Sequence, residues 1–181
     1  MLSSKERLAI AIDGRCGGGK TVLAEAISRR FDCNLFHVDD FYLPFELRTA
    51  ERMAIPGGHT DFERFLAEVL EPVSQGLDVR YRAFDCGTGE MEAERVVVAK
   101  PLSVIEGSYS HHPMLGDHYD CRIFVTCSPE EQIRRLAERE SPAMLRRFKE
   151  EWIPAEERYF AQYLIEDRSD LRLDTSPGSR S

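Results

Sequence analysis

Short apolar runs alternate along the chain with segments in which apolar residues recur every three or four positions. The runs stop at turns or acidic residues, as buried strands do, and the spaced segments are typical of amphipathic helices. The expected strands are 8–13, 34–39, 102–107, 122–127 and 171–174. The expected helices are 20–31, 62–73, one that opens at Ser128-Pro129, and 142–163. This order predicts an α/β domain with a mainly parallel sheet and helices on both faces.

The region 41–100 interrupts this alternation. Its first part, 41–59, is rich in proline and glycine and is expected to be mostly loop. Segments 79–84 and 95–98 read as a small β-hairpin around 87–89. With 181 residues, the chain suits a single domain, 1–181, in which 41–100 is an insertion.

A glycine-rich turn follows the first expected strand and leads into the first expected helix. It fits the pattern G-x-x-x-x-G-K-[ST], in which backbone N–H groups and a helix N-terminus hold phosphate. Lys20 can reach the β- and γ-phosphates, and the Thr21 hydroxyl can bind Mg²⁺. The predicted nucleotide-binding residues are Gly14, Arg15, Cys16, Gly17, Gly18, Gly19, Lys20 and Thr21.

Acidic residues close three of the expected strands. Ligands of parallel α/β sheets bind at the carboxyl ends of the strands, so these acids are candidates for chemistry. A kinase needs a base for the acceptor hydroxyl and a carboxylate near the metal, for which we select Asp39 and Glu106 respectively. Asp13 and Asp40 are weaker candidates that could equally cap turns.

Composition narrows the function classes. The net charge of −8 gives no general attraction to nucleic acid or to an anionic membrane, so any phosphate must be held by a local site. No apolar run approaches the roughly 20 residues of a membrane span, and the N-terminus does not resemble a signal peptide. Five cysteines without CxxC spacing favour reduced thiols in a cytoplasmic protein.

Several of these segments together resemble the uridine kinase branch of the P-loop kinases, which is related to phosphoribulokinase and bacterial pantothenate kinase. They occur in the family's order and cover most of the chain; the blocks with DDFY and EGSYS are more specific than the glycine-rich loop. The carrying stretches are 13–21 (DGRCGGGKT), 38–44 (VDDFYLP), 57–65 (GGHTDFERF), 81–86 (YRAFDC), 105–113 (IEGSYSHHP) and 119–124 (YDCRIF).

The resemblance implies a five-stranded sheet of order 2-3-1-4-5. It implies that Asp39 is the catalytic aspartate and that Glu106 lies at the metal site. It also implies Mg²⁺ as cofactor and ATP or GTP as phosphoryl donor.

The resemblance further implies an acceptor site. Tyr42 would line it, Asp61 would hold sugar hydroxyls, and Tyr81 and Phe84 would wall a base pocket. Uridine kinases have a pyrimidine-reading histidine near the end of the hairpin segment, where this chain has Asp85-Cys86. A non-nucleoside acceptor therefore stays open.

An arginine-rich stretch, 134–147, is the candidate lid. Arg135 and Arg139 lie four positions apart and share a helix face, from which a guanidinium could reach the transferring phosphoryl group. The alternative is a solvated face of Glu–Arg pairs. Aromatic residues of the last helix, Trp152 among them, are assigned to its core face, and His59 could line the acceptor pocket.

Three hypotheses for function follow. The first is an ATP-dependent kinase that phosphorylates a hydroxyl of a small molecule, with a nucleoside as the expected acceptor. The second is a kinase for a vitamin precursor or sugar phosphate, and the third is a nucleotide-binding regulatory module without phosphotransfer. The expected partners are the triphosphate and a small acceptor, without nucleic acid or membrane; a homo-oligomer stays open.

Overall fold

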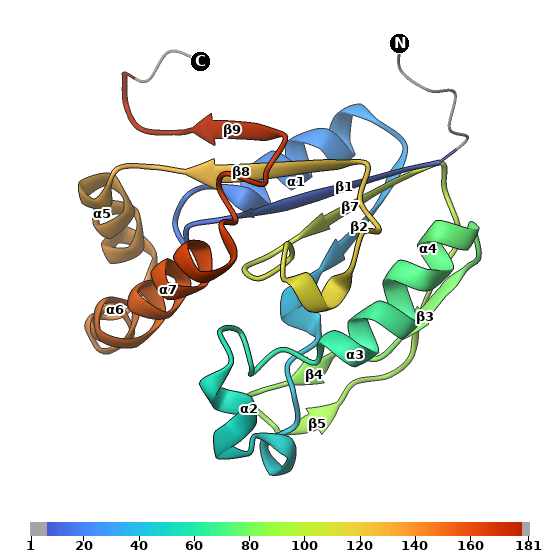
Figure 1. Ribbon diagram of the computed structural model, residues 1–181, viewed down its shortest axis with the longest axis horizontal. Coiled ribbons are helices and arrows are strands. Elements are labelled where there is room, and N and C mark those ends of the chain that lie inside the picture. The colour runs from blue at the N-terminus through green and yellow to red at the C-terminus, as the bar shows by residue number, and fades with distance from the viewer. Residues whose placement is uncertain (1–6, 179–181) are drawn as a thin grey trace.

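A five-stranded sheet forms the centre of the protein in a computed structural model that describes residues 7–178 (Figure 1). All four neighbouring pairs are parallel, in the order β2-β7-β1-β8-β9. Counted along the chain within this sheet, that order is 2-3-1-4-5, so the predicted arrangement is confirmed. The strands are β1 Leu8–Gly14, β2 Cys33–His37, β7 Leu102–Glu106, β8 Cys121–Thr126 and β9 Leu171–Asp174.

Helices cover both faces of the sheet. On one face, α1 (Lys20–Arg30) packs against alternate strand residues such as Ile12 and Val104. On the other face, Ala9 and Ala11 of β1 contact a larger core, which a helix at 62–75 and α7 (Ile153–Tyr163) also form. This two-residue alternation along β1 follows from the pleat of a strand.

The predicted helix at 62–73 is a continuous helical run with a π-helical middle. It consists of α3 (Phe62–Phe65), a π segment (Leu66–Leu70) and α4 (Glu71–Gln75). Its buried residues Phe62, Phe65 and Val69 turn one face toward the sheet, as the apolar spacing predicted.

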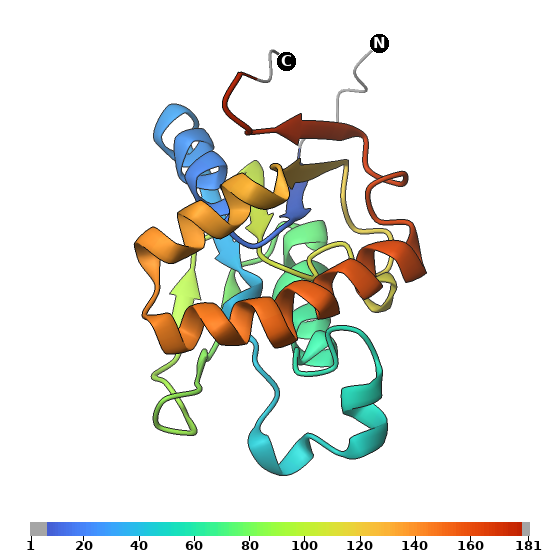
Figure 2. The same cartoon turned by 90° about the vertical axis from the view of Figure 1, so that its left-hand side faces the viewer.

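Two antiparallel helical runs lie beside the carboxyl ends of the strands (Figure 2). The first is α5 (Pro129–Arg139), whose N-terminus is capped by the Ser128 hydroxyl as its sequence predicted. The second combines α6 (Pro142–Arg147), a π segment (Phe148–Trp152) and α7. It confirms the predicted helix at 142–163.

The insertion lies below the sheet in Figure 1 and contains short elements. The predicted hairpin is present as two short antiparallel ladders. The strands are β3 (Val79–Tyr81) with β6 (Arg95–Val97), and β4 (Phe84–Asp85) with β5 (Glu90–Met91). Besides the helical run 62–75, the insertion contains a 3₁₀ turn at Phe45–Leu47 and α2 (Ala50–Ala54). Two further 3₁₀ turns lie outside it, at Val38–Asp40 and Pro113–Leu115.

Several strand boundaries differ from the prediction by one residue, and the carboxyl end of β2 differs by two. Strand β2 ends at His37, and Asp39 lies in the 3₁₀ turn that follows. The turn bends the chain at the sheet edge, so Asp39 stays at the carboxyl end of the sheet without being part of a strand. Within residues 7–178, no helix is both long enough and apolar enough to cross a membrane.

The start of the glycine-rich loop passes very close to β8. Gly14 has φ +130°, and a Cβ atom there would lie 1.9 Å from the carbonyl oxygen of Val125. Gly19 also has a positive φ, +100°, but a Cβ atom there would meet nothing within 4 Å. An alanine would therefore be strained by the positive φ at both positions, but only at Gly14 would it also clash with the backbone of β8.

Gly14→Ala should lower the free energy of unfolding by roughly 2–4 kcal/mol more than Gly19→Ala, because the added methyl group must push β1 and β8 apart. Urea denaturation followed by circular dichroism measures both variants. Equal losses in the two variants would show that the close approach of β1 and β8 is not a constraint.

Candidate nucleotide and acceptor site

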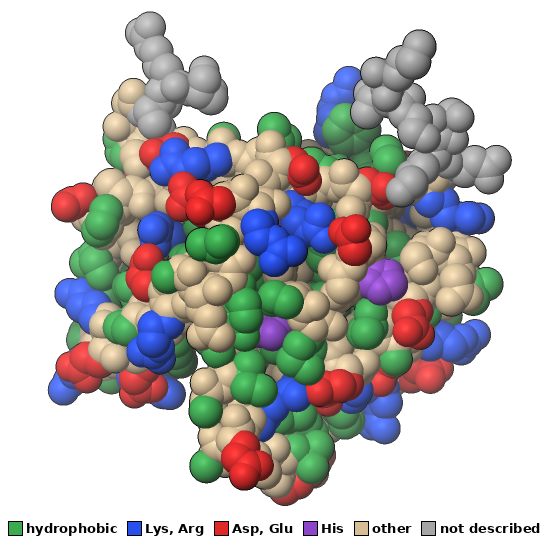
Figure 3. Space-filling view, viewed as in Figure 1, with side chains coloured by type: hydrophobic (Ala, Val, Ile, Leu, Met, Phe, Trp, Pro, Cys, Tyr) green, Lys and Arg blue, Asp and Glu red, His purple; other side chains and the backbone are tan. Residues whose placement is uncertain are grey.

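A cavity of about 1490 Å³ opens at the carboxyl ends of the strands. The glycine-rich loop, the insertion and the helical run 142–163 all contribute to its lining. On the face shown in Figure 3, acidic and basic side chains are interspersed. Any phosphate that binds in this cavity would therefore have to be held by its local groups.

The loop 14–21 and its lysine form one wall. Lys20 is buried, and its Nζ donates hydrogen bonds to the carbonyl oxygen of Gly14 at 2.7 Å and to Ser108 Oγ at 3.3 Å. The loop leads directly into the N-terminus of α1. Loop amides, a helix N-terminus and an ammonium group together make a site for an anion of high charge.

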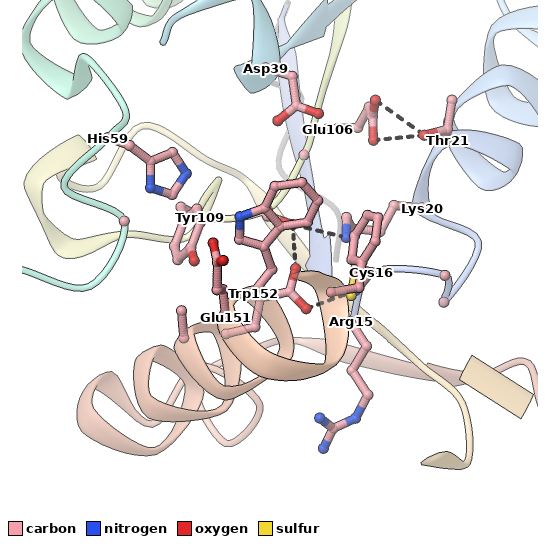
Figure 4. A pocket seen from close by; sticks show the side chains of 18 of the residues that line it. Arg15, Cys16, Lys20, Thr21, Asp39, His59, Glu106, Tyr109, Glu151 and Trp152 are labelled. Carbon is pink, nitrogen blue, oxygen red and sulfur yellow. Dashed lines mark hydrogen bonds between the residues drawn. The ribbon is translucent and has the colours of Figure 1, made fainter. Parts of the chain in front are cut away.

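Thr21 and Glu106 bring a hydroxyl and a carboxylate together beside this loop. Thr21 Oγ1 lies 3.3 Å from Glu106 Oε2 (Figure 4). Mg²⁺ prefers oxygen ligands and takes most of them from phosphate and water, so these two side chains fit a magnesium site. His37 Nδ1 lies 2.6 Å from the other Glu106 oxygen. That hydrogen bond raises the pKa of His37, so the ring holds its proton more strongly beside the carboxylate.

Asp39 faces the same cavity from the 3₁₀ turn after β2 (Figure 4). Its side chain is exposed within the open cavity. Desolvation by the surrounding cavity walls still raises the pKa of its carboxyl, Lys20 opposes this shift, and Glu106 adds to it. A raised pKa makes the carboxylate a better proton acceptor. The structure therefore brings the predicted base and the predicted phosphate loop to one cavity.

Aromatic rings form the wall beside Asp39. Tyr42 and His59 line the cavity and stack with ring centroids 5.7 Å apart, and His59 meets Tyr109 edge-on at 5.2 Å. Burial lowers the pKa of His59 to about 4, so its ring is neutral near pH 7. Tyr42 and His59 therefore line the cavity, and their contact with an acceptor stays a prediction; Tyr109 is an addition that the sequence did not single out.

Three predicted acceptor residues lie behind this wall and are not part of the cavity lining. Asp61 caps α3 by accepting a hydrogen bond from the Arg64 backbone N–H. The Tyr81 hydroxyl donates to Asp40 at 2.9 Å. Phe84 packs edge-on against Phe45, a residue of the cavity lining. These three residues therefore do not reach the cavity in this structure, and their contact with an acceptor stays a prediction.

The two candidate lid arginines have different surroundings, although both line the cavity. The Arg135 guanidinium donates to Glu131, to the Gly17 carbonyl oxygen at 3.1 Å and to both oxygen atoms of Thr175. Arg139 is exposed and pairs with Glu140. Arg135 thus braces the back of the loop, and Arg139 is freer to move toward a ligand.

Several residues of the site were missed or misplaced by sequence reasoning. Trp152 was assigned to the core face of the last helix, but it lines the cavity. Glu156 is buried against the glycine-rich loop, and its carboxylate accepts a hydrogen bond from the backbone N–H of Cys16 in that loop. In the sequence, Glu156 lies four positions after Trp152 and three before Tyr159, on the aromatic face of the predicted helix. An acid on such a face is the signal that could have singled it out, although not its contact with the loop.

Arg135→Ala should lower the free energy of unfolding by roughly 1–3 kcal/mol, because it removes the hydrogen bonds to the Gly17 carbonyl oxygen and to Thr175, whereas Glu131 keeps its second donor, Arg134. Arg139→Ala is the matched control on the same helix face and should change it by less than about 0.5 kcal/mol. Urea denaturation of both variants decides; equal effects would contradict the bracing role of Arg135.

We compared the chain with family models, curated proteins and solved structures. No family model matches the chain, and no curated protein matches it. Among solved structures, a possible uridine kinase from Bacillus stearothermophilus aligns with TM-score 0.72 and 18% identity over 96% of this chain and 91% of that one. A candidate fructose transport system kinase from a Silicibacter species aligns with TM-score 0.69 and 20% identity over 95% and 92%.

A D-glycerate 3-kinase from Cryptococcus neoformans aligns with TM-score 0.59 and 13% identity, over 94% of this chain and 86% of that one. At these identities the alignments establish the fold. The expected resemblance to the uridine kinase branch is confirmed at that level, and the chain has the fold of the P-loop kinases.

Proposed function

We propose that this protein is a magnesium-dependent kinase that transfers the γ-phosphoryl group of ATP or GTP to a hydroxyl group of a small molecule. The observation that carries the proposal is the shared cavity of the glycine-rich loop and Asp39. A bound triphosphate and an acceptor hydroxyl could meet there.

In this proposal, the chain's own groups first hold and orient the triphosphate. The amides of loop 14–21 and Lys20 bind the phosphate oxygens, and Thr21 and Glu106 hold Mg²⁺. A Mg²⁺ ion held there would supply positive charge to the phosphate oxygens. Phosphoryl transfer needs mainly positioning and electrostatic stabilisation, and these groups supply both.

Asp39 accepts the proton of the acceptor hydroxyl in this mechanism. The raised pKa of its carboxyl suits that task. Segment 134–147 acts as the lid, and the exposed Arg139 is its best candidate for reaching the transferring phosphoryl group. Closure excludes water, which would otherwise accept the phosphoryl group.

We propose that the acceptor is a nucleoside bound by the insertion 41–100. The rings of Tyr42, His59 and Tyr109 beside Asp39 offer a surface for a planar base. The similarity to a possible uridine kinase supports this choice. The similarity to a D-glycerate 3-kinase supports the second candidate, a non-nucleoside hydroxyl compound.

A panel of acceptors distinguishes these candidates. ADP release from MgATP should rise at least about tenfold over hydrolysis when the correct acceptor is added. Nucleosides, sugars, sugar phosphates, glycerate and pantothenate-like alcohols form the panel. Triphosphate binding without stimulation by any of them would favour a nucleotide-binding module and would contradict the kinase proposal.

Asp39→Asn should lower kcat about 10²- to 10⁴-fold because the amide cannot accept the hydroxyl proton. The Kd for MgATP should change less than about threefold, since no loop amide is altered. Asp40→Asn is the matched control: Asp40 bonds to Tyr81 and Arg95, and this variant should keep most of its turnover. Undiminished turnover in Asp39→Asn would remove Asp39 from the base role.

A further inference from the structure

Glu156 lies where an anion is expected. It is 4% exposed and extends from α7 toward the glycine-rich loop. Its Oε2 accepts a hydrogen bond from the Cys16 backbone N–H at 3.0 Å, and its Oε1 accepts one from Ser108 Oγ at 2.7 Å. Ser108 in turn accepts from Lys20 Nζ at 3.3 Å.

These contacts place a carboxylate inside the phosphate-binding apparatus. The Cys16 N–H belongs to the loop whose amides bind phosphate oxygens in this type of motif. Lys20, the cation of the same loop, is one hydroxyl group away. Glu156 therefore uses the groups that a triphosphate would use.

Burial makes this arrangement energetically significant. A carboxylate loses much hydration in such a position and is stabilised there only by donors and nearby positive charge. A triphosphate on the same loop would lie within several ångströms of it, where two negative charges repel strongly because little water screens them.

We propose that Glu156 is an internal anion that competes with the triphosphate for the Cys16 amide and thereby lowers the affinity of the loop for nucleotide. The inference rests on the proposed nucleotide binding at this loop. Binding requires Glu156 to release Cys16, which couples nucleotide occupancy to α7 and to the cavity residue Trp152 one turn earlier.

An opposing role makes the opposite prediction. If Glu156 only braced the loop in its binding conformation, removing its charge would leave nucleotide affinity unchanged or weaken it. Glu156→Gln separates the two roles, because the amide can still accept from Cys16 and contact Ser108 while carrying no charge.

The test is calorimetric titration with MgCl₂ and a non-hydrolysable ATP analogue. Glu156→Gln should tighten Kd by roughly 5- to 100-fold relative to the unchanged protein, the range of ordinary coupling between sites. Glu150→Gln, a loss of the same charge at an exposed position outside the cavity lining, is the control and should change Kd less than about twofold. An unchanged or weaker Kd in Glu156→Gln overturns the proposal.

A measurement on the unchanged protein keeps the proposal testable if the variant does not fold. With the analogue bound, hydrogen–deuterium exchange should slow in 14–21 and accelerate in 153–160, because α7 loses its bond to the loop. Slower or unchanged exchange in 153–160 overturns the proposal.

Failure of the proposed function gives a different result. If nucleotide binding tightens in Glu156→Gln but no acceptor is phosphorylated, the kinase proposal fails and the proposal for Glu156 stands. If an acceptor is phosphorylated but the variant binds nucleotide with unchanged affinity, the kinase proposal stands and the proposal for Glu156 fails. If neither protein binds the triphosphate, both proposals fail.

Discussion

The fully buried carboxylate of Asp13 joins the three segments on which the site depends. It accepts hydrogen bonds from the Gly14 N–H at 2.7 Å, the His111 N–H at 2.9 Å and the Tyr159 hydroxyl at 2.8 Å. These donors belong to the start of the glycine-rich loop, the segment after β7, and α7. Because a buried carboxylate is costly without its donors, the three segments are held together at one point.

This junction positions the groups of the proposed phosphate site in an acidic protein. The segment after β7 carries Ser108, and α7 carries Glu156, so both lie against the loop that Asp13 anchors. Lys20, the loop amides and the arginines of the cavity lining supply positive potential there, and Asp39, Glu106 and Glu156 place carboxylates beside it. What the cavity binds therefore depends more on the balance of these local charges than on the net charge of the protein.

The sequence predicted the parts of the site whose geometry is local. The glycine-rich loop and Lys20 are contiguous, so a motif describes them fully, and the alternation of apolar positions predicted the strands. Asp39 was placed correctly at the sheet edge although its strand ends two residues earlier. Which face of a helix packs against the loop is decided by tertiary packing, which the sequence pattern does not show. The contact of Glu156 with the loop and the bracing of the loop by Arg135 could therefore not be predicted. Asp61 shows the same limit, because one acidic residue can cap a helix or contact a ligand.

The most direct test of this account is a crystal structure with Mg²⁺ and a non-hydrolysable triphosphate. The account predicts phosphate oxygens on the amides of loop 14–21 and on Lys20, the metal at Thr21, and the Asp39 carboxylate facing the terminal phosphoryl group. A triphosphate bound elsewhere, or an Asp39 side chain turned away from the terminal phosphoryl group, would contradict it.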